Sequence, residues 1–182
     1  MRFIAAEIPS VIIIEPRAWE DHRGFFMETW NRGIFAEAGI DVEFIQDNHS
    51  RSVLGTLRGL HYQIGRPQGK LVRVTAGEIF DVVVDLRRNS TTFGRWVGRH
   101  LSANNRQMLW APPGFAHGFY VMSEFADFVY KCTDYYTPEC ERVLAWNDPD
   151  IAIDWPLAEN KAPRLSERDA RGLRLSEAEI FE

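Results

Sequence analysis

The sequence predicts an all-β domain built as a sandwich or barrel. Short runs of β-branched and aromatic residues recur at near-regular spacing, and turn-forming Gly, Pro, Asn and Asp residues separate them. Only one segment before the C-terminus has the pattern of a helix. Short strands of this spacing, with turns between them, are typical of β-sandwiches and barrels.

The N-terminal part is predicted to hold two strands and that helix. Residues 11–14 form a β-branched run, and residues 21–30 have the pattern of a polar turn followed by a second strand. Residues 31–38 are predicted to be helical, because Asn31 can cap the N-terminus and Gly39 can end the helix.

The remaining strands follow a polar stretch at residues 46–50, which is expected to precede the central strand. A turn is predicted at residues 65–69. The predicted strands are residues 56–63, 70–74, 79–86, 94–101, 107–111, 119–122 and 126–132. From residue 137 onward four prolines exclude long regular elements, so we expect this segment to wrap the β core as part of a single domain, residues 1–182.

Composition excludes several classes of protein. The formal charge is −5, with Lys and Arg spread along the chain, so we expect no nucleic-acid partner. No signal-peptide pattern and no apolar run of membrane-spanning length is present, which predicts a cytoplasmic protein without a membrane partner. Cys132 and Cys140 have neither ligand nor redox spacing.

The central strand carries a His in an apolar run. Strict alternation would place His61 on the face opposite Arg58, but Gly59 can mark a bulge that brings both side chains to one cavity. The structural alternative is a core His that is hydrogen-bonded to a backbone carbonyl. A buried imidazole is costly unless its ring nitrogens find partners.

Two further side chains are expected to face inward with His61. Lys70 shares a strand face with Val72 and Val74, an unusual position for a lysine, and Tyr130 shares one with apolar neighbours. This set suits removal of a proton beside a carbonyl: His61 as the base, Lys70 stabilising the enolate, and Tyr130 returning a proton. Tyr130 alone is equally consistent with a core aromatic whose hydroxyl is satisfied.

A charged substrate is suggested by Arg23, Arg58 and Lys70, which together could neutralise a diphosphate. Each could instead be a solvated surface charge. Near the C-terminus, Ser166 begins a capping-box pattern, but Gly172 makes a helix poor there, which leaves Asp169 free to orient an imidazole.

A metal site is the less favoured interpretation. Many double-stranded β-helix proteins hold a metal through clustered His and carboxylate ligands, whereas the five His residues here are scattered. If a metal were bound, His61, His117 and a carboxylate would be its most plausible ligands.

Several longer motifs occur in a familiar order: RGLHYQ at 58–63, KLV at 70–72, GFAHGF at 114–119 and LSERD at 165–169. With them the chain resembles the dTDP-4-dehydrorhamnose 3,5-epimerases. The resemblance implies a cupin-type jelly roll, or double-stranded β-helix, with short flanking helices and a C-terminal wrap. It also implies a homodimer without cofactor or metal, which inverts C3 and C5 of dTDP-4-dehydro-6-deoxy-D-glucose.

The resemblance also implies roles for individual residues. His61 would accept a proton and pair with Asp169, Tyr130 would donate one, and Lys70 would lie beside the keto oxygen. The implied substrate contacts are Gln46, Asp47, Asn48, Arg58, His117, Glu141 and Arg168, with the ring of Tyr136 near the substrate. The implied nucleotide-binding segment, which would reach the partner subunit's site, contains Arg23, Phe26 and Glu28.

Three alternatives to a double epimerase stay open. A monofunctional 3- or 5-epimerase of another dTDP-4-keto-6-deoxy sugar would share nearly all of these residues. A metal-dependent cupin oxygenase and a non-catalytic sugar-binding module belong to other functional classes. Metal analysis separates the oxygenase, and deuterium exchange from solvent into a dTDP-4-keto sugar separates the binding module. Counted carbon by carbon, this exchange is the most informative experiment.

Overall fold

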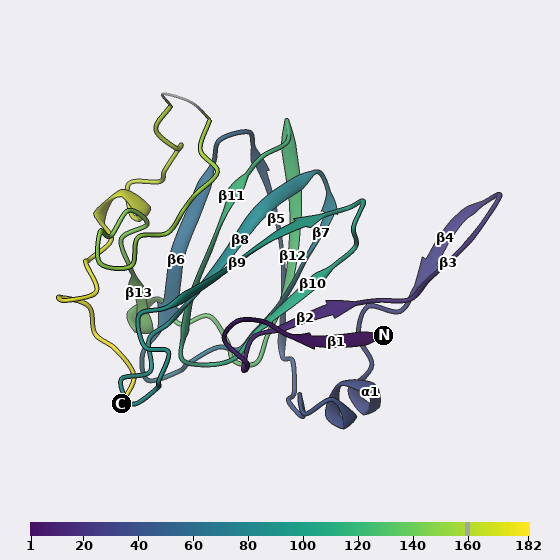
Figure 1. The fold of residues 1–182 in the computed structure, drawn as a ribbon, viewed down its shortest axis with the longest axis horizontal. Coiled ribbons are helices and arrows are strands. Elements are labelled where there is room, and N and C mark those ends of the chain that lie inside the picture. Colours follow the sequence, from purple (N-terminus) through teal and green to yellow (C-terminus); the bar gives the residue numbers. More distant parts are fainter. Residues whose placement is uncertain (159–160) are drawn as a thin grey trace.

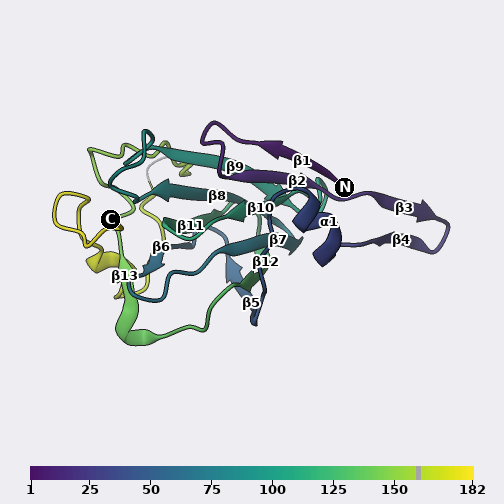
Figure 2. The same ribbon diagram turned by 90° about the horizontal axis from the view of Figure 1, so that it is seen from below.

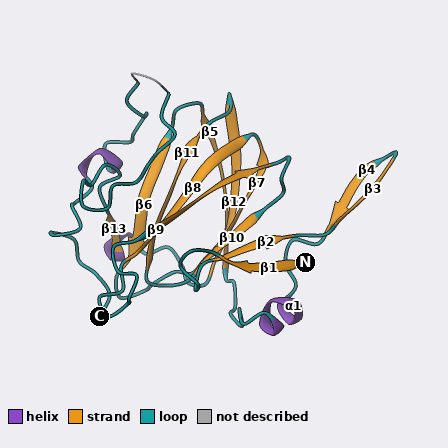
Figure 3. Cartoon of the chain, viewed as in Figure 1, coloured by secondary structure: helices purple, strands orange, loops and turns teal. Residues whose placement is uncertain are grey.

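The computed structural model describes residues 1–158 and 161–182, and two antiparallel sheets form the body of this part of the chain (Figures 1 and 3). From β5 to β12 the chain passes back and forth between the sheets, with only β8 and β9 consecutive in one sheet. This alternation is the jelly-roll arrangement, which confirms the predicted all-β fold class. No helix in the described residues is long and apolar enough to cross a membrane.

The six-stranded sheet has the order β1-β2-β10-β7-β12-β5. Its strands are β1 (Arg2–Ala5), β2 (Ile12–Glu15), β5 (Gln46–Val53), β7 (Lys70–Ala76), β10 (Met108–Ala111) and β12 (Phe125–Cys132). The five-stranded sheet has the order β13-β6-β11-β8-β9. Its strands are β6 (Leu57–Gln63), β8 (Glu78–Asp85), β9 (Trp96–Ser102), β11 (Phe115–Val121) and β13 (Glu141–Val143).

The main core lies between the two sheets. Val72 and Phe128 of one sheet pack in the same cluster as Ile79, Val83 and Phe119 of the other. Burial of each such side chain stabilises the fold by roughly 2 kcal/mol. This core fills one end of the sandwich, and polar side chains replace it where the cavity described below opens.

The C-terminal segment wraps the outer face of the five-stranded sheet, as predicted (Figure 1). Ile151 and Trp155 of this segment are buried with Leu57 and Val82. Isolated bridges also join Leu144 to Leu173 and Thr56 to Arg164. The last third of the chain therefore supplies a second core.

The predicted helix is present as α1 (Arg32–Glu37), which covers the outer face of the six-stranded sheet (Figure 2). The Asn31 side chain accepts a hydrogen bond from the backbone N–H of Ile34, and Gly39 follows the helix with φ +85°. Both predicted end signals are confirmed.

A hairpin of β3 (Ala18–Asp21) and β4 (Gly24–Met27) extends away from the body (Figures 1 and 2). In the described part of the chain its two strands pair only with each other. Residues 21–30 are predicted to be a polar turn followed by a strand; that strand is present as β4, but it ends at Met27. β3 is not predicted by the sequence, because charged residues interrupt its apolar pattern.

The prediction that residues 46–50 are only a polar lead-in is wrong, because they form the first half of β5. Exposure alternates along β5, with Gln46, Asn48 and Ser50 on the inner side. These inner residues are polar because they line a cavity and not the core. The strand predicted at residues 119–122 starts earlier than expected, since β11 already begins at Phe115.

Candidate active site

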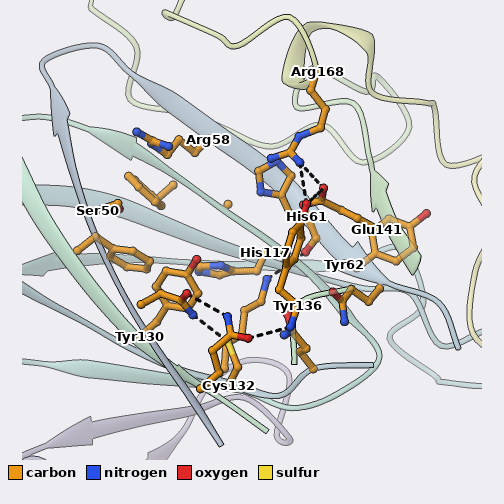
Figure 4. A pocket seen from close by; sticks show the side chains of 18 residues that line it. Ser50, Arg58, His61, Tyr62, His117, Tyr130, Cys132, Tyr136, Glu141 and Arg168 are labelled. Carbon is orange, nitrogen blue, oxygen red and sulfur yellow. Dashed lines mark hydrogen bonds and ion pairs between the residues drawn. The ribbon is translucent and has the colours of Figure 1, made fainter. Parts of the chain in front are cut away.

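A cavity of about 390 Å³ opens between the two sheets at the end where the core gives way to polar side chains (Figure 4). Strands from both sheets line it, together with the segment around Tyr136 and the C-terminal wrap. The predicted site residues in its wall are Gln46, Asn48, Arg58, His61, Lys70, His117, Tyr130, Tyr136, Glu141 and Arg168. Ser50, Gln63 and Cys132 also line the cavity from their strands, and Gln68 lines it from the loop before β7; beyond strand alternation, no feature of the sequence indicated these residues.

Gly59 explains why Arg58 and His61 reach the same cavity. The register between β6 and β11 shifts opposite Gly59, whose φ is +117°. A Cβ at Gly59 would lie 2.6 Å from the Cα of Gly118 and 2.7 Å from the carbonyl oxygen of His117, so only glycine fits. The predicted irregularity in this strand is confirmed.

His61 is paired with Asp169, as the resemblance implied. Its Nε2 lies 2.5 Å from Asp169 Oδ1, and Ser166 Oγ donates to Asp169 Oδ2 at 2.8 Å. Asp169 is only 3% exposed. Burial works to raise the pKa of Asp169, but the hydrogen bonds from His61 and Ser166 outweigh burial and lower it. The carboxylate is therefore charged and fixes the ring of His61.

Asp169 reaches His61 from a single 3₁₀ turn, Asp169–Arg171, in the wrap. The backbone N–H of Asp169 donates to Ser166 Oγ at 3.1 Å, as in an N-terminal cap, and the turn ends at Gly172. The expectation of a capping box without a stable helix is confirmed.

Tyr130 faces the cavity from the opposite sheet to His61 (Figure 4). Its ring packs against Phe128 with 5.5 Å between centroids. Burial raises the pKa of the Tyr130 hydroxyl, with only partial opposition from the charge of Arg58. The phenol therefore stays protonated near neutral pH and can donate a proton.

Lys70 lies at the start of β7 and lines the cavity, as its alternation with Val72 predicted. Its Nζ lies 3.5 Å from the carbonyl oxygen of His61. Burial lowers the pKa of the Lys70 ammonium, although nearby acidic groups act in the opposite direction. A cation held in this way is poised to interact with an anion in the cavity.

A second His–Asp pair faces the same cavity and was missed by the sequence reasoning. His117 Nε2 lies 2.8 Å from Asp81 Oδ1, and the His117 ring stacks on Phe128. Asp81 is fully buried, and its Oδ2 has no hydrogen-bond partner among the described residues. The sequence feature that could have indicated this pair is Asp81 itself, because aspartates are depleted in β-branched strands.

The rim of the cavity contains three linked side chains. Tyr136 donates from its hydroxyl to Glu141 Oε2 at 2.9 Å, and Arg168 pairs with the same carboxylate. Arg168 also donates to the Tyr136 hydroxyl at 3.3 Å. These residues come from the loop after β12, from β13 and from the wrap, and they meet at the mouth of the cavity (Figure 4).

The inner face of β5 continues this polar wall. Gln46 donates to Asn48 Oδ1 at 3.0 Å, and Arg58 donates from Nε to Ser52 Oγ at 2.8 Å. Asp47 lies between the inward side chains and faces outward, where Lys131 Nζ lies 2.9 Å from its carboxylate. Its position therefore does not support a substrate contact in this cavity.

The three residues of the implied nucleotide-binding segment do not line the cavity of their own chain. Arg23 pairs with Asp21 at 2.6 Å on the hairpin, and Phe26 is 70% exposed. Glu28, just after the hairpin, accepts a hydrogen bond from Asn31 at 3.3 Å. The hairpin thus presents Arg23 and Phe26 away from the body, whereas Glu28 contacts the N-terminal cap of α1.

Metal ligation has no three-residue cluster to support it within residues 1–158 and 161–182. His61 and His117 are each engaged by a carboxylate of their own. The two rings therefore do not share a carboxylate.

Comparisons of the sequence and of the structure with known proteins identify the same family. Residues 5–177 match the family model described as dTDP-4-dehydrorhamnose 3,5-epimerase. A protein of that name from Pseudomonas aeruginosa is 57% identical over 182 residues, covering 100% of this chain and 99% of that protein.

Two solved structures show how similar the folds are. The dTDP-6-deoxy-D-glucose-3,5-epimerase of Legionella pneumophila, in complex with dTDP-4-keto-L-rhamnose, has a TM-score of 0.95 and 52% identity, covering 98% of this chain and 94% of that one. A 3'-monoepimerase from Streptomyces bikiniensis, in complex with dTDP-quinovose, has a TM-score of 0.87 and 34% identity, with coverages of 94% and 86%.

Proposed function

Since the chain belongs to the dTDP-4-dehydrorhamnose 3,5-epimerase family, we infer that it inverts C3 and C5 of dTDP-4-dehydro-6-deoxy-D-glucose to give dTDP-4-dehydro-L-rhamnose. The observation that best supports this activity is the pair of groups that face each other across the cavity: the His61–Asp169 pair and the Tyr130 hydroxyl. Inversion beside a ketone needs a base on one side of a carbon and an acid on the other.

We propose His61 as the base. Its ring is held by a charged, buried carboxylate, which fixes the tautomer and stabilises the imidazolium that forms when a proton is taken from C3 or C5. The side chain of His61 is 22% exposed, so its free edge is accessible from the cavity.

The electrons of the broken C–H bond move onto the C4 keto oxygen, where Lys70 would stabilise the negative charge. A preorganised cation in a site of low dielectric constant acts more strongly than one in water. Removal of one such stabilising group typically lowers the turnover rate by about 10²- to 10³-fold.

Tyr130 would then return a proton to the opposite face of the same carbon. His61 is left protonated and Tyr130 deprotonated, and exchange with solvent restores both before the second carbon reacts. The raised pKa of the Tyr130 hydroxyl supports this role, because the group is neutral at the start and becomes a strong base once it has given up its proton.

We propose that the protein acts as a homodimer in which the β3–β4 hairpin reaches the cavity of the partner. Arg23 and Phe26 are exposed on a hairpin that makes no strand pairing with the body, as far as residues 1–158 and 161–182 show. An arginine and an aromatic ring suit a diphosphate and a base, respectively. The cytoplasmic location stays a prediction of the sequence.

The activity is tested by incubating the purified protein with the 4-keto sugar nucleotide in D₂O and counting deuterium at C3 and C5 by NMR. Deuterium at both carbons, with both configurations inverted, is the expected result. Incorporation at a single carbon would identify a monofunctional epimerase, as the name of the Streptomyces bikiniensis relative describes. Absence of exchange would refute epimerase activity.

A further inference from the structure

Arg106, on the turn between β9 and β10, attaches the β3–β4 hairpin to the body. Its guanidinium pairs with Glu20 of β3 at 2.6 Å and lies 4.2 Å from the ring centroid of Phe25 of β4. The Arg106 side chain is 25% exposed, and its Nε is buried without a hydrogen-bond partner in the described part of the molecule. One side chain therefore contacts both strands of the hairpin.

The hairpin has two faces, and Arg106 contacts only one of them. Glu20 is the register partner of Phe25, so these two side chains share a face. Trp19 is the register partner of Phe26, and this pair lies on the other face with 6.1 Å between ring centroids. Trp19 and Phe26 are 48% and 70% exposed. Arg17 lies over the Trp19 ring, 5.0 Å from its centroid, so while Arg106 holds one face, the ring of Phe26 is the more exposed part of the other.

The turn that carries Arg106 is itself rigid. The Asn105 side chain accepts from the backbone N–H groups of Ser102 and Gln107 and donates to the carbonyl of His100. Arg106 has a φ of 56°, in the left-handed region that non-glycine residues rarely occupy. Its side chain therefore starts from a fixed backbone.

We propose that Arg106 is a positioning residue for substrate binding. It holds the hairpin so that the Trp19–Phe26 face and Arg23 are presented to the nucleotide of a substrate bound in the partner's cavity. The inference rests on the proposed function, namely on the hairpin reaching that cavity. Arg106 acts through the hairpin and touches no reacting atom, so it affects substrate affinity and leaves the chemical step unchanged.

The test is steady-state kinetics of Arg106→Asn, because asparagine tolerates the left-handed conformation and preserves the turn. Loss of the ion pair and the cation–π contact is expected to raise KM about tenfold, with kcat within about twofold of wild type. Arg106→Lys should recover part of the lost affinity, because it keeps the charge opposite Glu20 but lacks the planar guanidinium over Phe25.

Arg99→Gln is the matched control. The Arg99–Glu7 pair has the same 2.6 Å separation and similar exposures, 28% and 68%, to those of Arg106 and Glu20, 25% and 63%. It does not involve the hairpin, so its loss should leave KM unchanged. If Arg99→Gln raises KM as much as Arg106→Asn does, the inference is overturned.

Arg23→Ala separates failure of this inference from failure of the proposed function. If Arg23→Ala raises KM while Arg106→Asn leaves KM unchanged, the hairpin binds nucleotide and only the role of Arg106 is wrong. If Arg23→Ala leaves KM unchanged in an active enzyme, the contact between hairpin and nucleotide is wrong and the role of Arg106 fails with it. A fall in kcat with unchanged KM in Arg106→Asn would also overturn the inference.

Discussion

Two His–Asp pairs project into one cavity from neighbouring strands, and they differ in how far each imidazole can reach a ligand. His61 and His117 are register partners across β6 and β11. The side chain of His61 is 22% exposed, whereas that of His117 is 7% exposed and is covered by Phe128. We therefore assign proton transfer to His61, and expect His117 to bind and orient the substrate.

His61→Asn should lower kcat by about 10³-fold or more, because a general base is lost while a polar group still faces Asp169. His117→Asn should lower kcat less, and should act mainly on KM. Deuterium exchange at C3 and C5 measures the loss of the base directly. Wild-type exchange in His61→Asn would contradict the assignment.

The choice of asparagine follows from the burial of Asp169. His61→Ala would leave a carboxylate that is 3% exposed with Ser166 as its only remaining side-chain partner. An uncompensated buried charge destabilises a fold by about 3 kcal/mol or more. Thermal unfolding of both variants separates this effect from the loss of chemistry.

Tyr130→Phe should separate proton removal from inversion. The ring keeps its packing on Phe128, but the hydroxyl that would protonate the opposite face is gone. We expect deuterium exchange with retained configuration to persist while formation of inverted product falls by about 10²-fold or more. Product formed at the wild-type rate would rule out Tyr130 as the donor.

At this scale, alternation along β7 and β12 was enough to predict which side chains face inward, whereas in β6 alternation alone would have placed Arg58 on the face opposite His61. It predicted the inward positions of Lys70 and Tyr130, and Gly59 signalled the irregularity beside His61. It did not identify Asp81 as the partner of His117, because a contact between neighbouring strands depends on register, which one sequence does not reveal.

Among the elements, the turn after β8 shows how burial increases the contribution of a local hydrogen-bonded motif to stability. Asp85 is fully buried and accepts hydrogen bonds from Arg87, Ser90 and Thr92. Burial works to raise the pKa of Asp85, but these hydrogen bonds prevail and lower it from 3.8 to about 2. The carboxylate therefore locks the connection between β8 and β9.

Asp85→Asn should reduce the free energy of unfolding at pH 7 by about 2 kcal/mol. Because the folded-state pKa lies below the unfolded one, this stabilisation is present above pH 4 or so and is lost as the pH falls toward 2. The difference between wild type and variant, measured by denaturant unfolding, should shrink over that interval.

Asp21→Asn provides the control, since Asp21 accepts from the backbone and side chain of Arg23 with the same spacing as Asp85 and Arg87. Asp21 is exposed, so its loss should change the free energy of unfolding much less than the loss of Asp85 does. Equal effects of the two substitutions would show that burial does not set the strength of the Asp85 turn.

Elements were predictable where local chemistry determined them. The caps of α1 and the β-branched runs of β2 and β8 were identified for that reason. β5 was missed because strand propensity reflects packing against an apolar core, and its inner face is polar where it lines the cavity. β3 was missed because only its pairing with β4 makes it a strand.

At the scale of the whole molecule, the proposed exchange of hairpins means that residues of two chains form each active site. Arg23→Ala subunits mixed with His61→Asn subunits should regain activity, because one site of each heterodimer combines an intact His61 with an intact Arg23. Random reassociation would restore about a quarter of the sites. The fraction of restored sites is measured as activity at low substrate concentration.

The same experiment can contradict the arrangement. If each hairpin served its own chain, the mixture would show only the average of the two separate variants. An active monomer in sedimentation at assay concentration would likewise exclude shared sites. β2 is paired on both edges, by β1 and β10, which leaves the hairpin as the exchanged part.

The His61–Asp169 pair also determines when the protein can become active during its synthesis. The two residues are 108 positions apart in the chain. At ribosomal rates the carboxylate is made roughly 5 to 20 s after the imidazole, when all the strands that line the cavity, from β5 to β13, have already been synthesised. A chain released before the last segment docks would hold most of the cavity wall but no partner to orient its base. Unfinished copies would therefore leave the sugar nucleotide largely unconverted.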